Sequence, residues 1–402
     1  MSAVLPARDS GVRRRPAGTG TIVEIRRDLA SLRALVPEWE ALASQAAEPN
    51  PFYEHWMLLP ALEAYGTNAG TNAPDGAEFR CIVVWENGTL AGLFPMHLER
   101  RFHGVPLPTL RPWRHRNMLL CGTPLVHAKY AARCLTALLQ SRLAPALELE
   151  WVPSDGAFYA ALVDALDAAK LPWLVADAYS RALLVRDRDP RERFNSNMKN
   201  NLRRWQARLA AAGAVTPVRL SPGDDLARWT AEFLRLEASG WKGKEGSALA
   251  CREDDRKFVA ATFPEAFRRG RLLITGLDLE GRPLARHCMI AAGEGAFTFK
   301  IAYDEAYAQH SPGIVAEVDN VRQFMDNPGP RWVDSNTARE NTSYGRVWKD
   351  RRSFQRVAVG LRGRGRLAVA ALPLARLLKR ALRRGPGGSM AEGRNAAGGP
   401  LP

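Results

Sequence analysis

The chain has 402 residues, of which 46% are hydrophobic and 25% are charged, an ordinary composition for a globular protein with room for two domains. Its formal net charge is +15, but residues 1–20 hold four Arg and one Asp, and residues 351–402 hold twelve Lys or Arg and one Glu. The body between these ends is therefore close to neutral, which argues against a nucleic-acid-binding domain, and no nucleic-acid partner is expected.

The five cysteines are an odd number without Cys-x-x-Cys spacing, so we expect neither a disulfide framework nor a metal site. The basic N-terminus, residues 1–20, is expected to be disordered. It lacks the apolar run of a secretory signal, so the expected location is the cytoplasm. Serine hydrolases, zincins and P-loop NTPases are excluded because the chain contains none of their motifs.

Two segments in different halves of the chain show the same pattern of strand, tight turn and strand. Residues 79–98 turn at Asn87-Gly88, and residues 271–290 turn at Glu280-Gly281. Each segment follows helical patterns and precedes a further strand, a glycine-containing loop and a helix. These later elements are expected at 119–126 and 131–140 in the first half, and at 296–303 and after Pro312 in the second. The sequence therefore predicts a tandem repeat of one α+β unit.

The boundary between the two units is expected where the strand-like residues 179–185 give way to Arg186-Asp187-Arg188-Asp189-Pro190. A long helical pattern follows over residues 192–212, and together with Arg191 it carries six basic residues. These basic residues either form a solvated helix face or lie over a donor cleft and neutralise phosphates. The expected organisation is a basic N-terminus, a first unit, a second unit and a basic tail, at 1–20, 21–185, 186–358 and 359–402.

The most informative segment runs from Phe297 to Phe324. A strand-like run over 297–303 leads into a loop that ends with Ser311-Pro312-Gly313, and a helical pattern follows. Pro312 suits the first turn of a helix, and Gly313 lets a ligand approach the backbone closely. The sequence therefore predicts a helix N-terminus whose free N–H groups form a phosphate cradle.

This segment also carries a family resemblance. The residues from Lys300 to Glu305, followed by Ser311-Pro312-Gly313, resemble the CelD-type acyltransferases of bacterial exopolysaccharide synthesis. These belong to the GNAT superfamily of N-acyltransferases and are related to the Fem-type aminoacyltransferases. The resemblance extends to residues 240–248, to Asp334-Ser335 and to residues 346–351, and it is fainter over 21–185. It implies an α+β fold of two tandem GNAT-like (acyl-CoA N-acyltransferase) units, each a mixed, mostly antiparallel central sheet flanked by helices.

The resemblance implies acyl transfer with acyl-CoA, expected to be acetyl-CoA, as co-substrate and without a permanently bound cofactor. The usual GNAT pyrophosphate loop carries Arg/Gln-x-x-Gly-x-Gly/Ala, whereas this chain keeps a Gln and one Gly without that spacing. Whether the donor is coenzyme A or another acyl carrier therefore stays open. The backbone between Phe297 and Ala302 is the implied oxyanion site. The implied donor-binding residues are Gln309, His310, Ser311, Gly313 and Ile314.

Four side chains near the end of the same strand are candidates for catalysis. Tyr303 or Tyr307 would protonate the leaving thiolate, unless both are packing residues. Asp304 or Glu305 would act as base, directly or through water, unless they cap a helix or pair with Lys300.

Four further residues are candidates for binding the acceptor. Lys300 lies on a strand with one enclosed face, so its charge needs a partner, either an anionic acceptor or Asp304. Trp241, Lys242 and Lys244 lie in a glycine-rich loop after a helical pattern over 226–238. They either bind a sugar or phosphate or anchor the loop. His287 is expected to be a hydrogen-bonded core histidine in preference to a base.

The segment 367–384 is too short and too charged to span a bilayer, which takes about 20 apolar residues. It is either a basic amphipathic helix on an anionic membrane surface or a soluble tail, and 385–402 are expected to be disordered. The leading hypothesis is an acyltransferase that modifies an amine or hydroxyl of a sugar, amino sugar or lipid-linked envelope or exopolysaccharide precursor. The alternatives are a Fem-type aminoacyltransferase using aminoacyl-tRNA, and a non-catalytic acyltransferase-fold accessory subunit of a polysaccharide synthase.

Overall fold

The computed structural model describes residues 20–67, 78–118, 121–339, 341 and 343–383, together with the strand β1 (Ala3–Val4). The expectations of disorder at 1–20 and 385–402 fall almost wholly outside these residues. So do residues 119–120 of the strand expected at 119–126.

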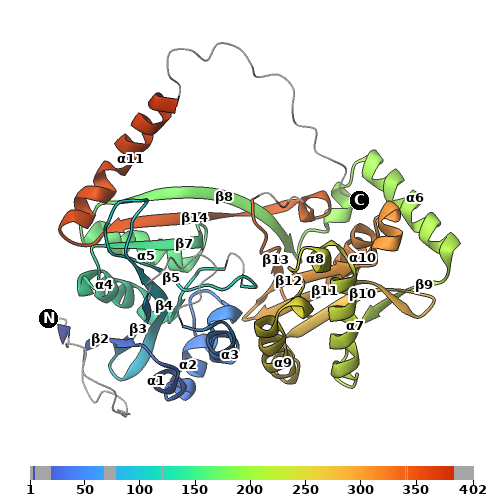
Figure 1. Cartoon of the computed structure of the whole chain (residues 1–402), viewed down its shortest axis with the longest axis horizontal. Coiled ribbons are helices and arrows are strands. Elements are labelled where there is room, and N and C mark those ends of the chain that lie inside the picture. The colour runs from blue at the N-terminus through green and yellow to red at the C-terminus, as the bar shows by residue number, and fades with distance from the viewer. Residues whose placement is uncertain are drawn as a thin grey trace.

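The first half of the chain contains short helices and a series of strands, among them the predicted hairpin over 79–98 followed by the predicted helix near 131–140 (Figure 1). The strands are β2 (Thr21–Arg26), β3 (Glu78–Glu86), β4 (Thr89–Glu99), β5 (Thr109–Pro112), β6 (Leu125–Val126), β7 (Ala146–Pro153) and β8 (Trp173–Val185). The helices are α1 (Leu29–Arg33), α2 (Val36–Ser44), α3 (His55–Tyr65), α4 (Ala131–Ser141) and α5 (Ala157–Ala168).

The second half repeats this succession of helices and strands. Its strands are β9 (Val215–Arg219), β10 (Leu272–Leu279), β11 (Arg282–Ala292), β12 (Gly295–Tyr303), β13 (Trp332–Asp334) and β14 (Asp350–Gly360). Its helices are α6 (Ser196–Ala212), α7 (Leu226–Ser239), α8 (Trp241–Lys244), α9 (Glu253–Arg268), α10 (Pro312–Asp326) and α11 (Arg364–Arg383), with 3-10 turns η5 (Glu305–His310) and η6 (Tyr344–Arg346).

Both predicted hairpins form, β3 with β4 and β10 with β11. Their turns use left-handed backbone at both central residues: φ is 49° at Asn87 and 76° at Gly88, and 51° at Glu280 and 71° at Gly281. This conformation matches the twist of the flanking strands and favours Asn and Gly. The local turn chemistry therefore fixes the register of both hairpins.

One continuous sheet joins the two halves, in the order β1-β2-β3-β4-β5-β7-β14-β8-β13-β12-β11-β10-β9. Outward from the central pair β14–β8, the order β7, β5, β4, β3, β2 on one side matches β13, β12, β11, β10, β9 on the other. The duplicated architecture is therefore visible in the sheet itself. The last strands are exchanged, because β8 pairs with β13 of the second half while β14 pairs with β7 of the first. The boundary expected at residue 358 consequently falls inside β14.

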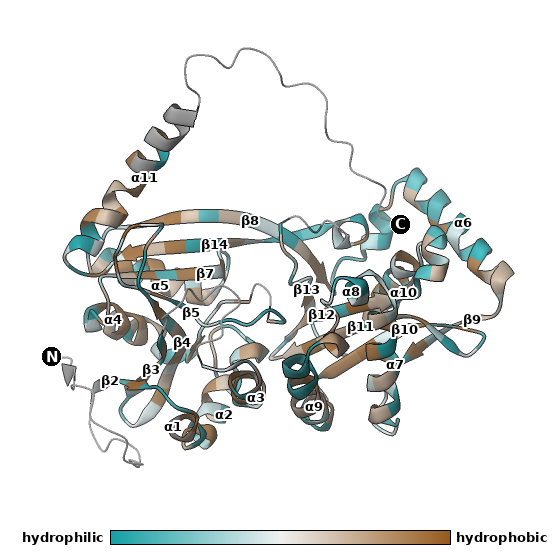
Figure 2. Ribbon diagram, viewed as in Figure 1, coloured by the Kyte–Doolittle hydropathy of each residue, from teal (hydrophilic) through white to brown (hydrophobic). Residues whose placement is uncertain are grey.

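Helices cover both faces of the sheet. The face that we call the α9 face packs against α1, α2, α3, α7 and α9, and its apolar residues from both halves form one continuous core. The opposite face, here the α10 face, packs against α4 and α5 in the first half and α10 in the second. In Figure 2 the strands between these layers are largely brown, whereas α6 is mostly teal.

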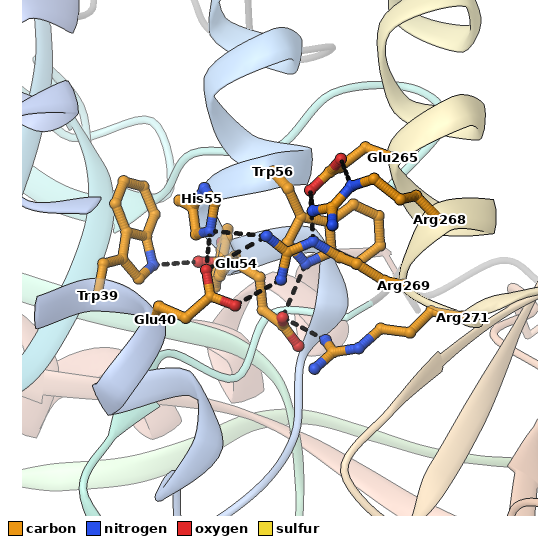
Figure 3. A network of polar contacts seen from close by, with 10 residues as sticks. Trp39, Glu40, Glu54, His55, Trp56, Glu265, Arg268, Arg269 and Arg271 are labelled. Atoms are coloured by element: carbon orange, nitrogen blue, oxygen red, sulfur yellow. Dashed lines mark hydrogen bonds and ion pairs between the residues drawn. The ribbon is translucent and has the colours of Figure 1, made fainter. Parts of the chain in front are cut away.

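Ion pairs reinforce the contact between α3 and α9, where the two units meet (Figure 3). Arg269 after α9 lies 2.5 Å from the Glu40 carboxylate and also pairs with Glu265. Arg271 pairs with Glu54, whose carboxylate accepts a hydrogen bond from the indole of Trp56 at 2.8 Å. Hydrogen bonds from Arg269 lower the pKa of Glu40 to about 2. The two units are thus joined by a shared sheet, a shared hydrophobic core and the ion pairs of Arg269 and Arg271.

The segment expected to be a basic tail begins as part of the folded body. β14 runs through Gly360, and α11 follows at Arg364. Val369 and Leu372 are buried against a cluster that includes Phe102 and Leu107. The body therefore extends at least to Leu372. No helix within the described residues is long and apolar enough to cross a membrane.

Candidate active site

The strand pairing in the middle of the second unit's sheet has a gap, which we call the opening. β12 and β13 pair in parallel only from Gly295 to Phe297, opposite Trp332 to Asp334. β12 then continues to Tyr303 with β11 as its neighbour, while the chain after Asp334 turns away. The family resemblance implies an oxyanion site on this part of β12, where a backbone edge without a strand partner can receive a ligand.

A buried polar turn, residues 334–336, directs the chain away from β12 at the end of β13. Asp334 pairs with Arg181 of β8, with Nε and Oδ1 2.6 Å apart, and it accepts the Asn336 N–H at 2.7 Å. Asn336 has a left-handed φ of 47°, and its side-chain amide donates to the Thr298 carbonyl at 3.3 Å. Asn is one of the few residues other than glycine that adopt left-handed backbone readily, and these two contacts fix the turn at Asn336. The strand exchange that brings Arg181 here thus positions the edge of the opening.

The equivalent place in the first unit is filled. β5 and β7 also pair over only two residues, Thr109 and Leu110 with Ala146 and Leu147. Beyond them Arg111 lies 2.5 Å from the fully buried Glu148. Gly122 presses on β7 so closely that a Cβ there would lie 1.9 Å from the Glu150 carbonyl oxygen. The first unit therefore has an ion pair and a close backbone contact at the position where the second unit has the Asn336–Thr298 hydrogen bond.

On the α9 face beside the opening, two lysines share one buried carboxylate. Glu237 of α7 has no exposed side-chain surface and lies 3.4 Å from the Lys242 Nζ and 3.7 Å from the Lys300 Nζ. Lys242 also donates to the Ile301 carbonyl at 2.5 Å. Burial lowers the pKa of Lys242, and the neighbouring Lys300 adds to this effect. The partner of Lys300 is thus Glu237 and not Asp304.

The glycine-rich loop expected at 240–248 begins with the single helical turn α8. Trp241 is 48% exposed, whereas Lys242 points inward and Lys244 is exposed. Glu305 accepts the Trp241 backbone N–H and lies 3.2 Å from the Lys244 Nζ. These contacts lower the pKa of Glu305. Trp241, Lys244 and Glu305 therefore meet, and Lys242 belongs to the neighbouring buried cluster with Lys300.

The remaining predicted catalytic side chains lie at the end of β12. Asp304 caps η5, because its carboxylate accepts the Ala306 N–H at 2.9 Å. Tyr303 packs against the start of α10, where a Cβ on Gly313 would lie 3.2 Å from its ring. Tyr307 packs partly into the cluster around Val315 and Ala316. Burial raises the pKa of Tyr303.

The predicted phosphate cradle at the start of α10 is partly occupied by its own backbone. Ser311 has a left-handed φ of 48°, and its carbonyl accepts the Ile314 and Val315 N–H groups at 3.0 and 3.1 Å. Pro312 has no N–H, so Gly313 contributes the remaining amide of the first turn. Gln309 is exposed, and the buried His310 Nδ1 makes no hydrogen bond to any described residue. α6 packs against η5 and α10, with its basic side chains Lys199, Arg203, Arg204 and Arg208 exposed.

A buried polar cluster lies on the α10 face next to the opening. His287 Nδ1 is 2.7 Å from Glu317 Oε2, and the Trp348 indole donates to the other oxygen of Glu317 at 2.6 Å. His287 Nε2 is buried and has no hydrogen-bond partner in the part of the chain that the structure describes. Burial raises the pKa of Tyr344 well above its usual value, against an opposing hydrogen bond with Thr298. The buried phenol of Tyr344 thus lies beside Thr298 of β12.

Sequence patterns missed Glu237, Glu317 and Tyr344. Glu237 and Glu317 have a recognisable signal, because each is a carboxylate within the apolar stripe of its helix, next to Leu236 and to Val318. Tyr344 has no comparable signal, since it lies in a short 3-10 turn whose position depends on the exchanged strand β14.

Two cavities lie away from the opening. One of about 670 Å³ is lined by the linker from Arg186 to Arg193 with Met325, Asp326 and Asp350. The other, of about 440 Å³, lies between α6 and α10 and includes Leu209, Val315 and Arg322. Among the described residues, no group of three or more His, Cys, Asp or Glu side chains is arranged to hold a metal ion.

Comparisons with known proteins connect this geometry to a fold. Residues 196–349 match the family model described as "Acetyltransferase (GNAT) domain". The C-terminal domain (DUF2156) of a putative lysylphosphatidylglycerol synthetase from Agrobacterium fabrum is similar in structure, with a TM-score of 0.50 and 11% identity over 85% of this chain and 95% of that chain. No curated protein matches the chain.

Two further solved structures show weaker similarity. FemX has a TM-score of 0.48 with 12% identity, covering 86% of this chain and 98% of its own. A tandem GNAT protein from the clavulanic acid biosynthesis pathway has a TM-score of 0.41 with 15% identity, covering 84% and 98%. The predicted fold class, an α+β protein of two tandem GNAT-like units, is confirmed by the mixed sheet, its duplicated order and the match of the second unit.

Proposed function

We propose that this protein is an acyltransferase whose second unit binds acyl-CoA, acetyl-CoA in the first instance, at the opening between β12 and β13. GNAT domains take acyl-CoA as their co-substrate, and the match to such a domain covers residues 196–349. One observation carries the proposal: β12 loses its partner after Phe297 in this unit, whereas Arg111, Glu148 and Gly122 fill the equivalent place in the first.

In this proposal the donor lies on the α10 face. Its thioester carbonyl is polarised by backbone N–H groups of β12 between Phe297 and Ala302, where the sheet offers an unpaired edge. Its pyrophosphate lies at the start of α10, near Gln309, His310, Ser311, Gly313 and Ile314. The Gly313 N–H, the helix dipole and the unpartnered His310 Nδ1 support this placement.

The transfer breaks the acyl carbon–sulfur bond and forms a carbon–nitrogen or carbon–oxygen bond to the acceptor. The acceptor loses one proton and the leaving thiolate gains one. We assign the thiolate's proton to Tyr344, because its phenol lies next to Thr298 on the part of β12 proposed to bind the thioester, with Tyr303 and Tyr307 as the alternatives. Asp304 and Glu305 remain the proposed bases. Both already accept backbone N–H groups, so each would act through a water molecule.

The acceptor approaches from the α9 face in this account. Trp241 offers an exposed ring for stacking, and Lys242, Lys244 and Lys300 supply positive charge around it. These features suit a sugar, an amino sugar or a lipid-linked precursor with an anionic group. The CelD-type resemblance supports an envelope or exopolysaccharide intermediate. We accordingly propose a cytoplasmic protein that works peripherally at the inner face of the membrane.

A thermal-shift titration tests the proposal, because a ligand that binds only the folded state raises the melting temperature by mass action. Acetyl-CoA, longer acyl-CoAs, free coenzyme A, acyl carrier protein and an aminoacyl-tRNA are titrated separately. We expect acetyl-CoA and coenzyme A to stabilise the chain. Stabilisation by aminoacyl-tRNA alone would favour a Fem-type reaction, and no stabilisation by any donor would favour an accessory subunit without catalysis.

A further inference from the structure

Helix α11 carries an exposed stripe of leucines. Leu367, Leu374 and Leu377 are 72%, 61% and 60% exposed. Their spacings of seven and three residues place them on one side of a helix. They account for half of the six large hydrophobic side chains that are exposed in the described part of the chain. An apolar stripe of this kind on a single helix calls for a partner.

The opposite side of α11 is already in use. Val369 and Leu372 are 0% and 9% exposed and pack against the first unit. The leucine stripe therefore cannot fold back on the sheet while this contact holds. Figure 1 shows α11 leaving the sheet at the end of the first unit and pointing away from the body.

The charge of the segment is entirely of one sign. Residues 361–383 contain seven Lys or Arg and no Asp or Glu. Arg364 and Arg366 are exposed near the start of the leucine stripe, and the later residues Lys379, Arg380 and Arg383 extend the basic character. A helix with leucines on one side, basic residues beside them and no acidic residue is complementary to a surface of anionic lipids.

We propose that α11 docks on an anionic membrane surface, with Leu367, Leu374 and Leu377 entering the interface and Arg364 and Arg366 contacting the headgroups. The part of α11 that packs on the first unit, around Val369 and Leu372, fixes the orientation of the body relative to the bilayer. Ala358, which clusters with residues of α11, and Val359, which clusters with residues of α4 and α5, lie on opposite faces of β14. α11 is thus on the α9 face, the same face as Lys300 and Glu237. A bilayer held by α11 therefore lies on the side of the sheet from which the proposed acceptor approaches.

Vesicle flotation of the full chain tests this surface. The wild type is compared on phosphatidylcholine vesicles and on vesicles that also contain phosphatidylglycerol, at low and high salt. We expect binding to the anionic vesicles only, weakening as salt screens the charges. Replacing the three leucines by serine (L367S, L374S, L377S) leaves every charge in place. We expect this variant to lose about tenfold or more in vesicle affinity, because its apolar contact is gone.

Two double arginine substitutions, one in the α11 segment and one in α6, provide the matched control. Removing two arginines from the α11 segment (R362S, R364S) is expected to lower vesicle affinity about tenfold, whereas removing two from α6 (R203S, R208S) leaves it unchanged. Equal losses in both pairs, equal binding to neutral vesicles, or full binding by the leucine variant would each overturn the proposal. Sedimentation without lipid adds one more outcome: a dimer that the leucine variant converts to a monomer would make the stripe a subunit interface instead.

Discussion

The side-chain amide of Asn336 donates to the carbonyl of Thr298 at 3.3 Å, across the gap where β13 leaves β12. This contact marks the edge of the opening in the second unit. The ion pair between Asp334 and Arg181 keeps the turn at Asn336 in place, since both side chains are only 1% exposed. The proposed acyl transfer requires an acyl donor to bind in this gap.

Tyr344→Phe is expected to lower kcat by about 100-fold while donor affinity is retained, because the ring stays and only the proton donor is lost. Tyr303→Phe and Tyr307→Phe are measured beside it. A loss confined to one of these two would move the acid role to that residue. Full activity in all three variants would show that no tyrosine protonates the thiolate.

Gly313→Val is expected to abolish donor binding, since a branched side chain would occupy space next to the first turn of α10. The structure adds a complication, because a Cβ at this position already lies 3.2 Å from the Tyr303 ring. The variant is therefore also made in a Tyr303→Ala background, where the ring is absent. If the double variant binds donor in calorimetry as tightly as Tyr303→Ala alone, the loss comes from packing and the phosphate site lies elsewhere.

Lys300→Met is expected to raise the acceptor KM about tenfold with donor affinity unchanged, since a charge-assisted contact to an anionic acceptor is lost. Glu237 keeps Lys242 as its partner, so the buried carboxylate is not left alone. Lys257→Met, on the exposed surface of α9, is the matched control. An unchanged KM in the Lys300 variant would mean that this lysine serves only to neutralise Glu237.

We expect the buried carboxyl of Glu48 to make the stability of the protein depend on pH. Burial raises its pKa to about 7 from an ordinary 4.5, against the attraction of Arg352. The folded state therefore keeps a proton that the unfolded state releases between pH 4.5 and 7, so this group makes the protein less stable as pH rises through that window. Glu48→Gln should remove the effect. The free energy of unfolding of the variant, relative to wild type, is expected to rise by about 3 kcal/mol from pH 4 to pH 8 in urea titrations. A constant difference would contradict the assignment.

The sequence predicts those parts of the fold that depend on neighbouring residues. Asn87-Gly88 and Glu280-Gly281 specify two hairpins, and Pro312 marks the first turn of α10, because these signals act within a few residues. The exchange of β8 and β14 cannot be predicted from local signals, because the sequence pattern of each strand is the same whichever strand it pairs with.

The same limit applies to the site. Lys300 needs a partner, which the sequence predicts, but the nearby Asp304 caps η5 while Glu237, far away along the chain, supplies the charge. Glu305 likewise binds the backbone of Trp241, 64 residues away. Tertiary packing selects among carboxylates that look equivalent in the sequence.

The most direct test of the central claim is amide hydrogen exchange of the full chain with and without acetyl-CoA, read peptide by peptide. The account predicts slower exchange in residues 298–303, 311–316 and 335–339, which border the opening and the start of α10. Residues 109–118 and 146–153, the equivalent region of the first unit, should exchange as before. Protection of the first unit with none in the second would contradict the account.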